Sequence, residues 1–316
     1  MEALTAAGWR RWRRHGLLRA LALGGLPALM PTLAPAPAFA QANERVIVEY
    51  RLAVAGTQTV DDARRTAVEA ALAEAVRRVV GTEVAALQQS LTTDKGEVEE
   101  RFLSLVRTSA AGRVVDFTVT REGLETIPGA VGRSTTVYAV TVQADVARER
   151  GNRDPGFSVT LKMDRPVYAD RGRPERNDEI VAEFTVTQDA YVTIFGVSDD
   201  TVQVLWPNAF ARDNRVAAGV AVRFPSADMR RRGIVVNAEL PPGRDRVIEL
   251  YAVVATKRPI PFLGPRGASP GGAPTVRGTL TALNRWLVNI PLDERAVAHA
   301  AYEVRRQVGS NPDSSR

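Results

Sequence analysis

Residues 190–207 read AYVTIFGVSDDTVQVLWP and predict a β-hairpin. Val, Ile and aromatic residues fill the runs 190–197 and 201–207, and these residue types are enriched in strands. Three short polar residues at 198–200 separate the runs, and such residues favour tight turns because they bond to their own backbone. Pro207 ends the second run because proline has no N–H to donate to a strand ladder. We therefore expect a β-rich domain around this hairpin.

Further short strands are predicted on both sides of the hairpin, with turns between them. They are 157–163, 179–188, 219–225, 233–240 and 245–256. Short strands at such spacing are typical of a β-sandwich, so we assign residues 157–306 to a β-sandwich domain. Residues 164–180 read as a polar loop and 257–274 as a long Pro- and Gly-rich loop. A helical pattern at 279–290 gives the domain a C-terminal helix, and 294–306 fits a helix or a strand.

Residues 43–148 predict a smaller α+β domain. The expected elements are a strand at 45–54, a helix at 59–81, a shorter helix at 97–110, and strands at 112–122 and 135–146 around a hairpin loop at 123–134. The long helix has apolar residues three and four positions apart, which form one stripe that packs on a sheet. The stripe is Ala63, Ala67, Val68, Ala71, Leu72, Ala75, Val76 and Val79. Alternation in the last strand places Tyr138, Val140, Val142, Ala144 and Val146 on one face. The fold class is α+β: a small strand–helix–hairpin α/β sandwich, a charged linker at 149–156, and the β-sandwich.

The first 40 residues read as an export signal. Four arginines between Arg10 and Arg14 precede an apolar segment, and residues 38–40 form an Ala-Phe-Ala cleavage pattern. The apolar segment is too short and too interrupted to span a bilayer. The arginine pair resembles a twin-arginine signal but lacks its usual neighbours, so the twin-arginine and Sec routes both stay open. We expect cleavage after Ala40, a periplasmic or secreted chain with no transmembrane anchor, and a disordered tail at 307–316.

The composition excludes several classes of protein. There is no cysteine, which excludes a lipoprotein anchor, disulfides, thiol nucleophiles and zinc–thiolate sites. The leader holds five of the 42 Lys and Arg and one of the 36 Asp and Glu, so the remainder carries 37 basic and 35 acidic residues. A net charge of +2 is too balanced for a nucleic-acid partner. We expect no cofactor, and the oligomeric state stays open.

Residues for catalysis are sparse. The predicted mature chain has one histidine, His299, for which we expect a surface or partly packed role in a terminal helix rather than that of a catalytic base. One histidine cannot form a histidine metal cluster, so no metal site is expected. Asp199 and Asp200 are predicted to build a turn, with a weak calcium corner as the alternative. Paired acids need only the right separation in space, so these two and Asp213 keep a carboxylate-dependent hydrolase open.

The stretch 204–219, VLWPNAFARDNRVAAG, holds candidate binding residues. They are Trp206, Asn208, Asn214 and Arg215, and the basic run Arg230, Arg231 and Arg232 adds three more. On a functional interpretation, Trp206, Tyr191 and Phe210 stack on a ligand or glycan, and the arginines contact an acidic partner or an anionic envelope polymer. On the structural interpretation, Trp206 is buried beneath the loop, the asparagines shape turns and the arginines are solvated.

Two resemblances bear on function. AYVTIFGV, VLWPN, DNRVAAG, RFP, ELPPGRDRV and WLVNI…AYEV occur in the order seen in domain of unknown function 4384, which the C-terminal region resembles. That resemblance implies a β-rich module appended to envelope or signalling proteins, with no known reaction. DDARRTAVEAALAEAVRRVVGTEV, GRVVDFTV and TTVYAVTVQADV resemble the N-terminal domain of flagellar assembly protein T. This second resemblance implies a periplasmic assembly module, and no flagellar role follows from it.

These observations predict an exported, non-enzymatic envelope protein that acts as a protein-interaction or assembly module. Docking through edge strands or through the loop 257–274 onto an envelope protein is the expected mechanism. The alternatives are a periplasmic protein that binds a ligand or glycan and, less expected, the carboxylate-dependent hydrolase. The sequence leaves the partner, the ligand and the pathway open.

Overall fold

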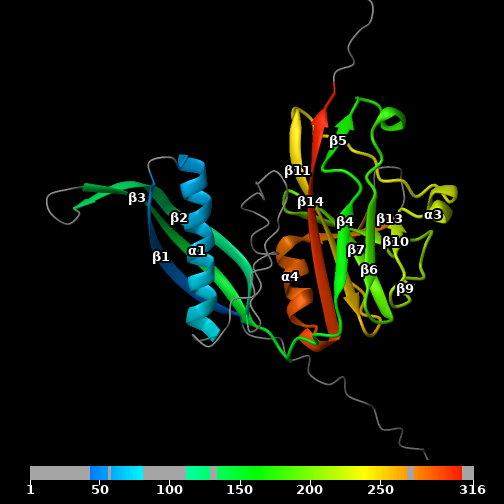
Figure 1. Cartoon of the computed structure of the whole chain (residues 1–316), viewed down its shortest axis with the longest axis horizontal. Helices are drawn as coiled ribbons and strands as arrows, with labels where there is room; N and C mark the ends of the chain where they lie inside the picture. Colours follow the sequence, from blue (N-terminus) through cyan, green and yellow to red (C-terminus); the bar gives the residue numbers. More distant parts are fainter. Residues whose placement is uncertain (1–42, 56–57, 81–111, 129–133, 269–273, 308–316) are drawn as a thin grey trace, which may run out of the picture. The chain divides into compact units, whose positions relative to one another are not determined.

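The computed structural model contains two sheet-based regions within residues 41–316, which cluster as one unit (Figure 1). The residues that the structure describes are 43–55, 58–80, 112–128, 134–268 and 274–307. The predicted leader, the predicted helix 97–110 and residues 308–316 of the predicted tail lie outside the described residues.

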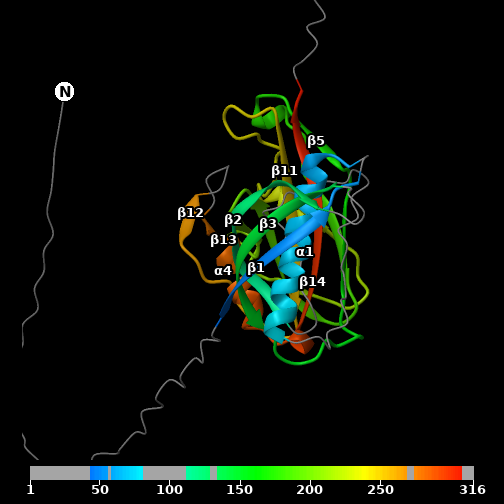
Figure 2. The same cartoon turned by 90° about the vertical axis from the view of Figure 1, so that its left-hand side faces the viewer.

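The first region is a three-stranded antiparallel sheet with one long helix on one face (Figure 2). Its elements are β1 (Glu44–Ala53), α1 (Val60–Val80), β2 (Gly112–Pro128) and β3 (Ser134–Arg148), and β3 lies between the other two strands. The predicted α1 stripe is confirmed, because all eight of its residues are buried. They pack on the predicted face of β3, from Tyr138 to Val146. Small alanine side chains let the helix approach the sheet closely.

The hairpin between β2 and β3 extends further than its sequence predicts. Residues 123–134 were expected as a loop, but β2 continues to Pro128 and β3 begins at Ser134. Residues 120–122 of β2 are exposed and residues 122–128 alternate between exposed and half-buried, so both faces of this part of the ribbon meet solvent. The ribbon therefore has no apolar face from which a strand could be predicted.

The second region contains two β-sheets and is the predicted sandwich. The small sheet has the order β10-β6-β4, formed by Val222–Phe224, Ala182–Val186 and Val159–Met163. The large sheet has the order β12-β13-β8-β7-β11-β14-β5, and β9 pairs with β7. Its strands are β12 (Arg266–Ala268), β13 (Pro274–Thr279), β8 (Thr201–Trp206), β7 (Ala190–Ser198), β11 (Arg246–Thr256), β14 (Arg295–Arg306), β5 (Val167–Asp170) and β9 (Arg215–Val216). Short helices α3 (Ala227–Arg231) and α4 (Leu280–Val288) and 3-10 turns at Pro174–Arg176 and Leu292–Glu294 complete the region.

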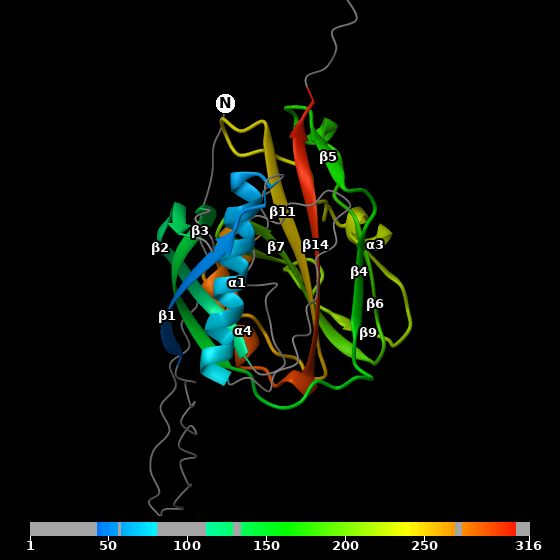
Figure 3. The ribbon, with the colours of Figure 1, turned by 60° about the vertical axis from the view of Figure 1, so that its left-hand side comes forward.

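The large sheet is covered on both faces (Figure 3). Alternate residues of β7 show this, because Val192 and Ile194 pack toward the small sheet while Phe195 and Val197 pack toward α4. The Thr279 side chain caps α4 by accepting from the Ala282 N–H. The expected C-terminal helix is thus α4, and its apolar side fills the second core.

A β-bulge in the quoted hairpin reverses the direction of its last side chain. Ile194 pairs with Trp206 and Phe195 pairs with Val204, which leaves Leu205 as an extra residue in β8. Val204 therefore packs toward α4, whereas Trp206 packs toward the small sheet, with its ring centroid 6.3 Å from that of Phe184.

Three predicted segments differ from the structure, and the structure decides a fourth that was left open. Residues 167–170 of the predicted polar loop form β5, a strand too short to show a period in the sequence. Residues 233–240 are apolar but make only one isolated bridge, between Asn237 and Glu179, so they are no strand. Parts of the predicted loop 257–274 form β12 and the start of β13. The sequence fitted either a helix or a strand at 294–306. In the structure, residues 295–306 form strand β14, which pairs along β11.

The two regions share a buried charged joint. Glu149, in the predicted linker, accepts from Arg113 of β2 at 3.0 Å and from Arg295 of β14 at 2.6 Å, and all three side chains are at most 2% exposed. Asn284 of α4 accepts from Arg113 at 3.2 Å, and Val288 of the same helix packs with residues of β2 and β3. The segment that joins the regions therefore also contributes to the contact between them.

Candidate functional site

A cavity of about 700 Å³ opens between the large sheet and the segment 233–239. The sheet contributes residues of β7, β8, β11 and β14, and the irregular segment that follows α3 covers them. Volumes of roughly 300–1,000 Å³ are usual for small-molecule sites.

Three polar side chains converge at the floor of the cavity. Glu249 of β11 lies directly opposite Tyr302 of β14, and the Tyr302 hydroxyl donates to Glu249 Oε2 at 2.7 Å. Tyr251, two residues along β11, shares the same face and is fully shielded from bulk water. Its hydroxyl has no hydrogen-bond partner among the described residues. The floor therefore contains a carboxyl group and an unused hydroxyl beneath an opening.

Burial dominates the electrostatics of this floor. Desolvation raises the pKa of Glu249 above its ordinary value, although the hydrogen bonds from Tyr302 and Ser198 act in the opposite direction. Desolvation, with the nearby Glu249 carboxylate, also raises the pKa of Tyr251 and of Tyr302, so both phenols keep their protons. The aromatic rings of Tyr251 and Tyr302 meet edge to face at 5.5 Å, which holds both side chains in place.

The walls of the cavity are mainly apolar, with some uncharged polar side chains, and its charged residues are both acidic. Ile180, Leu205, Ile234 and Val236 line it, and Phe210 lies at its margin with 49% of its surface exposed. Glu239 and Glu249 are its two acidic residues. Among the described residues that line the cavity, there is no lysine, arginine or histidine.

The predicted binding residues of the 204–219 stretch have structural contacts. Trp206 is 5% exposed within the core, so its ring lies beneath the loop and off the surface. The Asn208 side chain donates to the Leu205 carbonyl and accepts from the Phe210 and Ala211 amides, which closes the turn after β8. Asn214 donates to the Val192 carbonyl at 2.9 Å and joins the same turn to β7.

The four candidate arginines pair with acidic side chains. Arg215 lies 3.5 Å from Asp189 and is largely exposed. Arg230 pairs with Glu179 at 2.6 Å, and Arg231 and Arg232 both pair with Asp228 one turn earlier in α3. The run of three arginines is thus divided between two partners rather than gathered at one point. Of all seven candidates, only Asn208 lines the cavity.

The acidic residues that kept a hydrolase open, and His299, do not line the cavity. Asp199 pairs with Arg244 at 3.3 Å, Asp200 accepts from the first amide of α4, and Asp213 accepts from the Arg215 amide. His299 lies on β14, not on the expected terminal helix. Burial, together with the neighbouring Arg113, lowers the pKa of His299 to about 3, so the imidazole is neutral at ordinary pH. No group of three or more metal-ligating side chains occurs in the described part of the chain.

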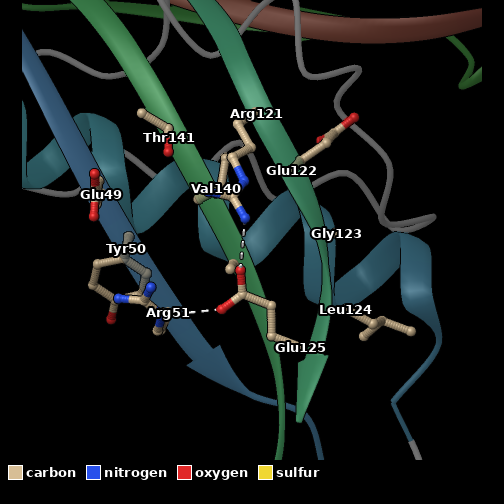
Figure 4. Close-up of a pocket in the computed structure, with 11 residues that line it drawn as sticks. Glu49, Tyr50, Arg51, Arg121, Glu122, Gly123, Leu124, Glu125, Val140 and Thr141 are labelled. Carbon is tan, nitrogen blue, oxygen red and sulfur yellow. Dashed lines mark hydrogen bonds and ion pairs between the residues drawn. The ribbon is translucent and has the colours of Figure 1, made fainter. Parts of the chain in front are cut away.

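A smaller hollow of about 210 Å³ lies on the first region, between β1, β2 and β3 (Figure 4). Glu125 lies between two arginines there, 3.3 Å from Arg51 and 3.6 Å from Arg121. Arg121 is 80% exposed, so water screens these pairs. The hollow is a charged surface groove on the sheet, and its polar lining distinguishes it from the sandwich cavity.

Sequence reasoning missed Glu249, Tyr251 and Tyr302. A signal was present, because both faces of the strand DRVIELYAVVAT are apolar and Glu249 falls on the same face as Val247, Tyr251 and Val253. A carboxyl group on the buried face of a strand is uncommon unless it is paired, and it marks a position to inspect.

Comparison with protein-family models finds a match in the second region. Residues 175–259 match the model of a domain of unknown function, DUF4384. All cavity-lining residues except Pro174 and Tyr302 lie within the DUF4384 region, whereas α4 and β14 lie beyond it. The cavity is therefore almost entirely a feature of the DUF4384 region.

The other comparisons add no relative, because no curated protein and no solved structure matches the chain. Among the helices that the structure describes, none combines the length and the apolar character needed to cross a bilayer.

Proposed function

We propose that the chain is an exported binding protein that acts without catalysis and holds a ligand in the cavity of its DUF4384 region. The observation that carries this proposal is the cavity itself, with apolar walls and a polar floor formed by Glu249, Tyr251 and Tyr302. Ligand sites commonly combine an apolar lining with a few convergent polar groups that fix orientation. Of the functions that the sequence left open, ligand binding is the one that this geometry favours.

The positions of the acidic residues support binding over hydrolysis. Asp199, Asp200 and Asp213 hold turns or cap a helix, and each uses its carboxylate or backbone for that purpose. Glu249 is held by a neutral phenol at 2.7 Å, an arrangement suited to receiving a donor from a ligand.

A neutral fluorescent probe tests the proposal. We expect N-phenyl-1-naphthylamine to bind the mature chain, residues 41–316, at one saturable site with increased fluorescence. Ser198→Phe places a ring beside the floor and should abolish this signal, because Ser198 lines the cavity. Thr160→Phe, at an exposed position of β4 outside the cavity, is the matched control and should bind normally. Equal binding by both variants, with circular dichroism showing both folded, would place the probe elsewhere and contradict the proposal.

A second candidate function is docking of an envelope protein on the first region. The resemblance of residues 43–148 to the N-terminal domain of flagellar assembly protein T supports an assembly role for this region. The hollow beside Arg51, Arg121 and Glu125 supplies exposed charges that a partner would meet. Affinity capture from envelope extract with the mature chain and with Arg121→Glu tests this candidate, which predicts a protein that the variant fails to retain.

Export is part of the proposal and rests on the leader. We expect the chain to accumulate in the periplasmic or secreted fraction with Gln41 as its first residue. Intact-mass spectrometry of the purified protein measures this directly, and a mass that retains residues 1–40 in the cytosolic fraction would contradict it.

A further inference from the structure

We propose that the ligand of the DUF4384 cavity is an organic cation, with an ammonium or guanidinium group at the floor and an apolar body along the walls. This inference rests on the proposed function and specifies the chemical class of its ligand. It is carried by the charge of the lining, by an unpartnered buried hydroxyl and by the apolar walls.

The charged residues of the lining are acidic, whereas the chain as a whole has more basic than acidic residues. The protein has 42 Lys and Arg against 36 Asp and Glu, yet the described lining holds two acids and no base. Neither Glu239 nor Glu249 forms an ion pair within the described part of the chain, whereas Glu179 and Asp199, each next to a lining residue, pair with arginines. A carboxylate in an apolar cavity without a countercharge is costly, and a cationic ligand would supply the missing charge.

The hydroxyl of Tyr251 is an independent indication of a polar ligand group. It is fully buried at the cavity floor and has no partner among the described residues. Buried hydroxyls almost always have a hydrogen-bond partner, so an unpaired one beside a cavity indicates an absent partner. An ammonium or guanidinium group donates several hydrogen bonds and could satisfy both Tyr251 and Glu249.

The remaining lining suits an apolar body and an attached cation. Leu205, Ile234 and Val236 offer aliphatic surface, and the half-exposed Phe210 offers an aromatic ring. Cations bind favourably to aromatic faces, most of all where water is excluded. A fully polar cation such as ammonium itself would leave the aliphatic walls uncovered.

Three probes that share an eight-carbon alkyl chain and differ in their polar group test the inference. Isothermal titration calorimetry of the mature chain at neutral pH would compare n-octylammonium, 1-octanol and octanoate. We expect n-octylammonium to bind about tenfold or more tightly than 1-octanol, because a hydrogen bond to a charged group is worth that much. Octanoate should bind most weakly, since it places a second anion beside Glu249.

Single-residue variants identify the carboxyl group that binds the cation. Glu249→Gln should weaken n-octylammonium binding about tenfold and leave 1-octanol unchanged. Glu183→Gln removes an exposed carboxyl group of β6 outside the cavity and should change neither. Circular dichroism checks folding, and Glu239→Gln, with a smaller expected loss, replaces Glu249→Gln if that variant does not fold.

The outcomes separate the two proposals. Equal affinity for the three probes, or an unchanged n-octylammonium affinity in both cavity variants, would overturn the cation inference while leaving cavity binding in place. No binding of the octyl probes combined with normal N-phenyl-1-naphthylamine binding would also overturn the inference. Absence of binding by every probe would overturn the proposed function itself.

Discussion

Tyr302 lies directly across the strand pair from Glu249, and its hydroxyl donates to the Glu249 carboxylate at 2.7 Å. This pair connects β14, outside the DUF4384 match, to the floor of the cavity inside it. The carboxylate is thereby oriented but not neutralised, since a phenol contributes a hydrogen bond without a charge. The first prediction depends on this distinction.

Tyr302→Phe should raise the pKa of Glu249 further, because the hydrogen bond that favours its charged form is removed. The pH below which n-octylammonium binding is lost should therefore move upward, while affinity at high pH changes little. The charged or titratable groups that influence Glu249 are Tyr302, Asp199 and Tyr251, and neither phenol titrates in this range. Calorimetric titrations across pH measure the shift, and an identical pH profile in the variant would contradict this role for Tyr302.

The raised pKa of Glu249 also predicts how stability varies with pH. A carboxyl group whose pKa is higher in the folded state contributes stability below its ordinary pKa, and this contribution is lost as pH rises through the folded pKa. Glu249→Gln has no such dependence. The free energy of unfolding of the natural chain, relative to that of the variant, should therefore fall as pH rises from acid to neutral. Urea titrations at several pH values measure this difference, and a constant difference would show that Glu249 has an ordinary pKa.

The buried joint between the regions should be sensitive to its single acid. Glu149→Gln leaves Arg113 and Arg295 buried without a countercharge, and breaking a buried pair in this way costs about 3–5 kcal/mol. Burial already lowers the pKa of Arg113 to about 10, which reflects the cost of the charge there.

Glu74→Gln is the matched control for the joint, because Glu74 also contacts two arginines, at 2.7 and 3.2 Å, but on the exposed side of α1. Its cost should be at most about 1 kcal/mol. Urea unfolding measures both values. Similar small losses for the two variants would mean that the joint contributes little to stability.

Trp206 and Phe210 should have separate roles. Trp206→Ala removes a ring from the sandwich core and should destabilise the chain by about 3–5 kcal/mol. Phe210→Ala, at a half-exposed position on the cavity margin, should change stability by about 0.5 kcal/mol or less and weaken probe binding. Thermal unfolding and N-phenyl-1-naphthylamine titration distinguish them, and unchanged binding in a stable Phe210→Ala variant would remove this residue from the site.

The elements with regular periods were predictable from the sequence. The stripe of α1 and the alternating face of β3 repeat at intervals that local geometry dictates, so each residue could be assigned before any contact was seen. The turn at 198–200 was predictable from its short polar residues, and Asp199 adopts a positive φ of 51° there.

The cavity was not predictable in this way, because it depends on an irregular segment. Residues 233–240 have the composition of a strand, and their departure from the sheet depends on tertiary contacts such as the Ile180 amide with the Val236 carbonyl at 2.8 Å. The face of the sheet on which the Trp206 side chain lies was not predictable either, since the bulge at Leu205 in β8 reverses it. Of the candidate binding residues, Asn208 closes the turn after β8, Asn214 bonds to β7, Trp206 lies in the core and the four arginines pair with acidic side chains.

The binding of an organic cation in the cavity is tested most directly by measuring which backbone amides change their chemical shift when the ligand is added. In amide nitrogen–proton spectra of the mature chain, titration with n-octylammonium should shift Gly196, Ser198 and residues 234–237, all with one saturating midpoint. Amides of α1 and β1 should stay in place. Shifts scattered over exposed acids without saturation, or no shift at the cavity, would contradict the proposed site.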